Sequence, residues 1–123
     1  MAIDRSAFMR AAERRYELVS VPGLGEVRLQ SLTQSEMRAI RTSLRTKDGE
    51  VDRERFDRVD QILVSATAVD DNGTPLFSDD DAMGRTFDAI DGGAWAVLTA
   101  AVKRHTGWAA DEDWQPVRAA AKN

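Results

Sequence analysis

Hydrophobic and polar positions follow the spacing of helices over most of the chain and the spacing of strands over one short stretch. The first helical segment covers residues 4–15. Its short apolar face consists of Phe8, Met9 and Ala12, and arginines occupy much of the rest. Because a helix of this length is marginal by itself in water, we expect it to dock on another surface.

A β-hairpin is predicted at about residues 16–32. Apolar and polar side chains alternate through Tyr16 and Leu18 on one flank and through Val27 and Leu29 on the other. The sequence Pro-Gly-Leu-Gly at residues 22–25 separates the flanks and is typical of a slightly long hairpin turn.

Two helices are predicted after the hairpin. The sequence Thr-Gln-Ser-Glu at residues 33–36 is a capping box, in which threonine accepts from a first-turn amide and glutamate reaches back. It opens a helix that carries Met37, Ile40 and Leu44 and ends at residues 47–49. A second helix is expected from about Asp52 to Val69, with an apolar stripe of Phe56, Val59, Ile62, Leu63 and Ala66.

Two more helices are predicted beyond a polar turn at residues 70–75. Ser78 caps the first of them, and its buried stripe is expected to contain Met83, Phe87 and Ile90. The second runs from residue 94 to residue 106, and Gly107 follows it at the position of a left-handed C-cap. Its residues at helical spacing are Trp95, Leu98, Ala101, Val102 and His105.

These elements predict a mainly α fold, a small helical domain with one N-terminal β-hairpin. We expect residues 1–109 to form a single, mostly helical domain. Residues 110–123 are acidic and then alanine-rich, and we interpret them as a C-terminal tail.

The composition is that of one ordinary soluble domain, with 123 residues, 42% hydrophobic and 31% charged. Residues 1–47 carry nine Lys/Arg against five Asp/Glu and residues 48–123 carry eight against sixteen, so the two parts are about +4 and −8. This asymmetry favours attraction between the two parts or head-to-tail association of copies, and it does not favour nucleic acid. No apolar run approaches membrane-spanning length, so we expect no membrane partner and a cytoplasmic location.

No pattern in the sequence supports catalysis, a cofactor or a metal ion, so we predict that the chain is not an enzyme. There is no cysteine, and the single histidine, His105, lacks a recognisable set of catalytic partners. The glycines at residues 23 and 25 are typical of a hairpin turn, because the third glycine of a nucleotide-binding loop is missing. The acidic turn at residues 70–73 lacks the ligand spacing of a calcium loop.

Aromatic and apolar side chains outside the predicted core are candidates for partner binding. Phe8 and Met9 lie on the first helix, and Trp108 and Trp114 follow the last one. Trp108 is also compatible with folding back to seal the helices. Trp114 follows the acidic residues 111–113 and precedes Gln115 and Pro116, and it is compatible either with folding back or with a role as an interface anchor.

The order of these motifs resembles that of the tail assembly chaperones of long-tailed bacteriophages over roughly residues 5–109. The resemblance rests on the sequence Val-Arg-Leu-Gln-Ser-Leu-Thr-Gln-Ser-Glu at residues 27–36, which ends in the Thr-x-x-Glu box at 33–36. It also rests on the sequence Asp-Asp-Asn-Gly-Thr-Pro-Leu-Phe-Ser-Asp-Asp-Asp at residues 70–81 and on the late Thr-Gly at 106–107.

This resemblance implies a non-enzymatic role in phage tail assembly in the cytoplasm of the host cell. Members of the family escort the tape measure protein while tail tube subunits polymerise around it, and they are absent from the mature virion. Many are also made in a longer form by programmed frameshift, and the extension recruits the tail tube protein. The short form is expected to associate weakly with itself.

The end of the chain is compatible with such a frameshift. Ala121, Lys122 and Asn123 can be encoded by a string that contains A AAA AAY, which has the form of a −1 slippery heptamer. Synonymous codons would remove the heptamer, so the protein sequence leaves both readings open.

Two alternative functions remain open at this stage. The first is a head-tail connector or tail-completion protein of a phage, which would form a stable ring by itself. The second is a small DNA-binding regulator, for which the most basic helical stretch, residues 37–47, offers four cations but only a moderate apolar stripe.

Overall fold

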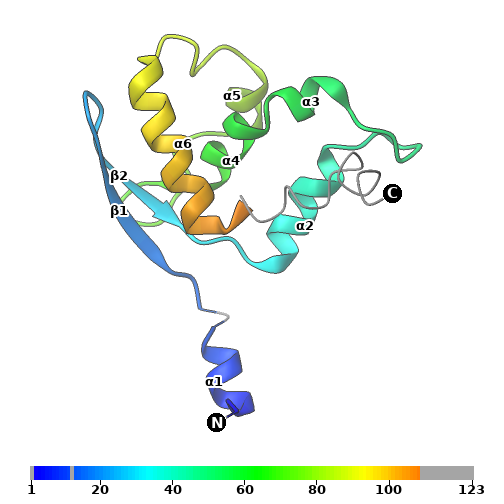
Figure 1. Ribbon diagram of the computed structural model, residues 1–123, viewed down its shortest axis with the longest axis vertical. Coiled ribbons are helices and arrows are strands. Elements are labelled where there is room, and N and C mark those ends of the chain that lie inside the picture. The colour runs from blue at the N-terminus through cyan, green and yellow to red at the C-terminus, as the bar shows by residue number, and fades with distance from the viewer. Residues whose placement is uncertain (1, 12, 109–123) are drawn as a thin grey trace, which may run out of the picture.

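The computed structural model describes residues 2–11 and 13–108. The chain forms six helices and three strands within these ranges (Figure 1). The helices are α1 (Arg5–Arg10), α2 (Gln34–Ser43), α3 (Arg53–Asp57), α4 (Val59–Thr67), α5 (Asp79–Met83) and α6 (Gly92–Thr106). The strands are β1 (Tyr16–Val21), β2 (Gly25–Gln30) and β3 (Ala68–Val69).

β1 and β2 form the predicted hairpin, and the turn between them needs glycine. The two strands pair antiparallel from Tyr16 opposite Gln30 to Val21 opposite Gly25. Gly23 and Gly25 have φ values of 82° and 104°, in the left-handed region that favours glycine.

The prediction of a mainly α fold with one hairpin is wrong, because the fold is mixed α and β. The structure is 48% helical and 16% strand, and its helices are short. β3 adds a third antiparallel strand in the order β1-β2-β3, with Leu29 of β2 opposite Ala68. We expected residues 68 and 69 to end a helix that began near Asp52. Instead they leave α4 and pair with β2, a contact between distant parts of the chain that local spacing does not reveal.

The expected second helix also divides in two. α3 and α4 meet at Arg58, whose φ of −111° and ψ of 21° interrupt the helical geometry. The Arg58 guanidinium donates to the carbonyl oxygens of Ala82 and Gly84, at 3.3 and 2.6 Å, and so joins this break to the end of α5.

The core lies between α4, α6 and one face of the sheet. α4 contacts α5 and α6, and α6 contacts β1. The largest fully buried side chains include Leu29, Leu44 and Leu63. α6 ends as predicted at Gly107, which has a φ of 79° and whose N–H donates to the Lys103 carbonyl oxygen at 2.8 Å.

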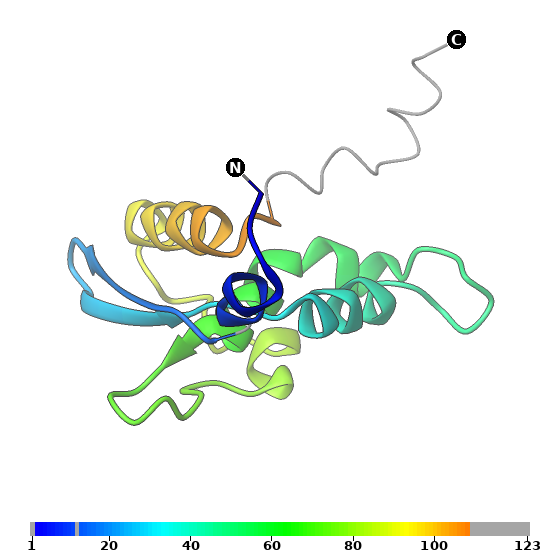
Figure 2. The same cartoon turned by 90° about the horizontal axis from the view of Figure 1, so that it is seen from below.

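α1 lies apart from this core. Figure 1 shows it projecting from the N-terminal end of β1, away from the other helices. Figure 2 shows the hairpin turn and the loop between α2 and α3 on opposite sides of the body. No helix in the described part of the chain is both long enough and apolar enough to span a bilayer.

Candidate functional site

The N-terminal arm, which we define as residues 2–11, presents apolar side chains to solvent. Its helix α1 begins at Asp4, whose carboxylate accepts a hydrogen bond from the Ala7 N–H at 2.8 Å. None of the residues of α1 is buried. Ile3, Phe8 and Met9 are exposed by 67%, 65% and 52%. The helix that we expected over residues 4–15 is shorter than predicted, because α1 ends at Arg10 and has six residues.

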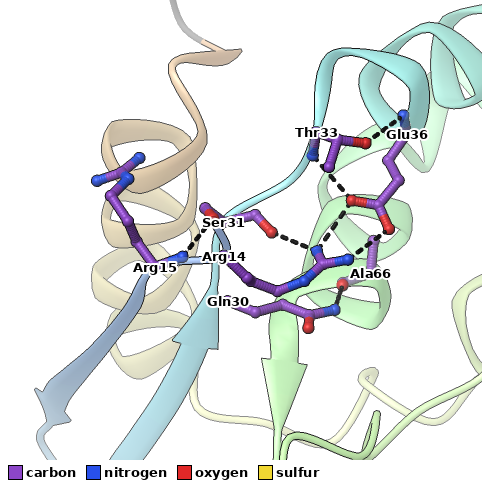
Figure 3. Close-up of polar contacts among 7 residues, drawn as sticks. All are labelled: Arg14, Arg15, Gln30, Ser31, Thr33, Glu36 and Ala66. Carbon is purple, nitrogen blue, oxygen red and sulfur yellow. Dashed lines mark hydrogen bonds and ion pairs between the residues drawn. The ribbon is translucent and has the colours of Figure 1, made fainter. Parts of the chain in front are cut away.

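Arg14 ties the root of the arm to α2. Its Nη1 donates to the Ser31 carbonyl oxygen at 2.6 Å and to Glu36 Oε1 at 2.9 Å, and its Nη2 donates to Glu36 Oε2 at 3.0 Å. Figure 3 shows this two-pronged contact between the arginine and the first turn of α2. A bidentate arginine–carboxylate pair fixes direction as well as distance, so it sets where the arm leaves the body.

The predicted capping box holds the glutamate of this pair in place. The Thr33 side chain accepts from the Glu36 N–H at 3.1 Å, and the Glu36 carboxylate accepts from the Thr33 N–H at 2.8 Å. The hydrogen bond from Arg14 is the main cause that lowers the pKa of Glu36, and the Thr33 N–H lowers it further. The carboxylate is therefore charged at neutral pH and accepts from both partners.

Neighbouring polar contacts fix the strand that follows the arm. The Arg15 N–H donates to Ser31 Oγ, and the Ser31 N–H donates to the Arg15 carbonyl oxygen, both at 2.8 Å. Gln30 donates from Nε2 to the Ala66 carbonyl oxygen at 2.9 Å, which connects β2 to α4 (Figure 3). Arg15 Nη2 also lies 3.4 Å from the His105 carbonyl oxygen at the end of α6. The segment that follows the arm, Arg14 and Arg15, is thus fixed by polar contacts to Ser31 after β2, to α2 and to α6.

A cavity of about 300 Å³ lies between the arm and the start of α2, and we call it the arm cavity. Its apolar lining comes from Phe8, Met9, Ala11 and Leu32. Arg14 and the first residues around α2 complete the lining, so the same arginine that orients the arm borders the cavity.

A second cavity of about 300 Å³ lies between α2 and α4, and we call it the α2–α4 cavity. Its apolar lining consists of Ala39, Ile40, Ile62 and Ala66, and its polar lining consists of Ser43, Ser65, Arg55 and Asp79. Glu36, Ile40 and Ser43 are spaced by four and three residues, so they share one face of α2. The Arg14–Glu36 pair and the α2–α4 cavity therefore follow each other along that face.

An ion pair forms part of the rim of the α2–α4 cavity. Arg55 donates from Nη2 to Asp79 Oδ1 at 2.9 Å and from Nη1 to Asp79 Oδ2 at 3.1 Å. The hydrogen bonds from Arg55 are the main cause that lowers the pKa of Asp79, and those to Asp79 raise the pKa of Arg55. Two more carboxylates, Asp80 and Asp81, follow Asp79 in the first turn of α5.

The residues predicted to bind partners have different surroundings. Phe8 and Met9 are exposed on the arm, as described above. Trp108 is only 6% exposed and belongs to the hydrophobic core, with the Arg41 guanidinium 5.6 Å from the centre of its ring. Its side chain thus packs back onto the helices. Trp114 and the frameshift residues Ala121, Lys122 and Asn123 lie outside the described residues.

The sequence revealed the capping box but not the ion pairs that frame the two cavities. Arg14 and Glu36 are 22 residues apart, and Arg55 and Asp79 are 24 residues apart. Both pairs form between elements that only the tertiary fold brings together, so no local spacing could have identified them.

His105 is buried at the edge of the core. Its Nδ1 lies 3.1 Å from Glu17 Oε1, and its side chain is 3% exposed. Within residues 2–11 and 13–108, no three His, Asp or Glu side chains are grouped so that they could hold a metal ion.

No family model, no curated protein and no solved structure matches this chain.

Proposed function

We propose that this chain is a tail assembly chaperone of a long-tailed bacteriophage, which has no enzymatic activity and escorts the tape measure protein while tail tube subunits assemble around it. The observation that carries the proposal is the arm, where Phe8 and Met9 stay at the surface and no residue of α1 is buried. A helix that buries nothing in its own chain gains its stabilising contacts from another chain.

A second apolar surface supports the same role. On the outer face of β1, Tyr16 and Leu18 are exposed by 45% and 59%, while Val19 and Val21 on the opposite face are buried. A chaperone that coats a long client needs one surface for the client and another for its neighbours. Each contact can then be weak, because many copies bound along one client hold it together through avidity, and the weak contacts allow the client to be released later.

The resemblance in motif order completes the proposal. It implies action in the host cytoplasm, absence from the mature virion, and a frameshifted longer form that recruits the tail tube protein. The two sequences that carry most of this resemblance form capping boxes in the structure, at Thr33–Glu36 and Ser78–Asp81.

Co-expression with the tape measure protein encoded near the gene of this chain tests the proposal. We expect the tape measure protein to be insoluble when expressed alone and to become soluble and co-purify with this chain. An unrelated, aggregation-prone coiled-coil protein serves as the control client and is expected to remain insoluble. A tape measure protein that stays insoluble with an excess of this chain contradicts the proposal.

Two further observations separate the chaperone from a head-tail connector. A connector forms a stable ring by itself, which electron microscopy of the purified chain detects. The nucleotide sequence of codons 121–123 shows whether the A AAA AAY heptamer is present and whether a −1 reading frame continues beyond it.

A further inference from the structure

We infer that copies of this chain associate head to tail, with the arm of one copy in the α2–α4 cavity of the next. In this contact Phe8 enters the cavity, and Arg5 pairs with Asp80, the residue that follows Asp79 of the cavity lining. The inference concerns the same arm as the proposed function, but it needs no client, and the purified chain alone tests it.

The arm presents a compact combination of apolar and basic side chains. Arg5 lies three residues before Phe8 and four before Met9, so the three side chains share one face of α1. Within the described part of the chain, neither Arg5 nor Asp80 forms an ion pair. Both charges are therefore available to a second copy.

The α2–α4 cavity is complementary to this face in size and polarity. An apolar cavity of about 150 Å³ is already large enough for benzene, so about 300 Å³ accepts a phenylalanine side chain. Ala39, Ile40 and Ile62 supply apolar contacts to such a ring.

The charges of the two surfaces are also complementary. Three consecutive carboxylates occupy the first turn of α5, and Arg55 balances only that of Asp79. Arg5 and Arg10 are the basic residues of α1. This local contrast follows the distribution along the whole chain, where the first 47 residues are about +4 and the rest about −8.

Two other arrangements of the arm are less favourable. Arg14 holds the root of the arm at the start of α2, so the arm of the same chain lines the arm cavity and not the α2–α4 cavity. A symmetric contact between two arms would bring Arg5 and Arg10 of both copies together. A heterologous contact avoids this repulsion and can continue from copy to copy.

Sedimentation velocity of the full chain over a range of concentrations tests the inference. We expect the average mass to rise with concentration and to fall when salt is added, because the contact includes an ion pair. Phe8→Asp and Ala39→Arg each change one side of the contact at an exposed position. Each is expected to weaken association at least tenfold, with an unchanged circular dichroism spectrum.

Mixing the two variants is the decisive experiment. The Phe8→Asp chain retains a working cavity and the Ala39→Arg chain retains a working arm, so an equimolar mixture should form a one-to-one dimer that grows no further. The combination Arg5→Asp with Asp80→Arg should restore the association that either change alone removes. Leu24→Asp, at a position in the hairpin turn that is 46% exposed, is the matched control and should leave association unchanged.

Three results would overturn the inference: a wild-type chain that stays monomeric at all concentrations, a mixture that stays monomeric, and an Ala39→Arg chain that associates normally. None of these results bears on whether the chain solubilises a tape measure protein. Failure of that co-expression experiment, in turn, leaves the association of copies untouched.

Discussion

In α4, five of nine residues are buried, whereas in α1 none of six is. Both segments are amphipathic, and the difference lies in what surrounds them. α4 contacts α5 and α6 on its apolar side, whereas Phe8 and Met9 of α1 border the arm cavity and stay more than half exposed. The stability of the chain therefore resides in the α4–α6 core, and the apolar side chains of the arm stay at the surface.

The largest expected effect comes from a cavity in the core. Leu63 is fully buried in α4, so Leu63→Ala should lower the free energy of unfolding by about 2–5 kcal/mol. Urea denaturation followed by circular dichroism measures this loss. The control Leu18→Ala, at a position exposed by 59%, should change the stability by less than about 0.5 kcal/mol. Equal losses would mean that the core does not dominate stability.

A smaller effect is expected at the end of α6. Gly107 has a φ of 79°, and a Cβ added there would have no atom beyond its chain neighbours within 4 Å, so Gly107→Ala introduces backbone strain without a steric clash. The cost should be about 1–2 kcal/mol in the same denaturation experiment. Gly92 lies in the first turn of α6 without a positive φ, and Gly92→Ala should instead stabilise by about 0.4–1 kcal/mol. If both changes had the same sign, the left-handed cap would not be the cause.

The ion pair that connects the arm to α2 should appear in the pH dependence of stability. Because the pKa of Glu36 is lower in the folded chain, its contribution is present above the ordinary glutamate pKa of about 4.3 and is lost as the pH falls through the folded value. The Glu36 side chain is 40% exposed, so solvent limits the contribution to about 0.2–1 kcal/mol.

Glu36→Gln tests this dependence. The variant should be less stable than wild type at pH 7 and should approach it at pH 3, since the protonated glutamic acid resembles glutamine. The pKa values of Asp79 and Asp81 are lowered too, so the variant should still lose stability in acid, though less steeply. Identical pH profiles of the two chains would mean that Glu36 does not contribute.

The smallest effect on stability is expected in the arm. Phe8→Ala removes a large apolar side chain, but this side chain is 65% exposed and should change the free energy of unfolding by less than about 0.5 kcal/mol. Chemical denaturation of dilute protein is the measurement, so that association does not contribute. A loss of several kcal/mol would show that the arm belongs to the folded core.

The elements that could be predicted are those whose signals are local. The capping boxes at Thr33 and Ser78, the hairpin turn at residues 22–25 and the left-handed cap at Gly107 each depend on a few adjacent residues. The sequence also indicated that the apolar residues of the first segment lacked a core of their own.

The features that could not be predicted depend on contacts between distant segments. β3 is only two residues long and forms because it pairs with β2. In the sequence, its two residues continue the helical spacing of α4, so the spacing does not distinguish them from the helix. α5 was expected to reach Ile90 but ends at Met83, and Phe87 is buried from a run of turns instead of a helix. In the candidate site, the two cavities arise where α2 meets the arm and α4, which residue spacing does not define.

The connection of α1 to β1 has a mechanical consequence. A partner that pulls on the arm applies its force at the N-terminal end of β1, in line with the strand as Figure 1 shows. The hydrogen bonds to β2 run across that direction, over a register of six residues, so they bear the load together in shear and do not open one after another. A partner bound to the arm can therefore pull on β1 without separating it from β2 one residue pair at a time.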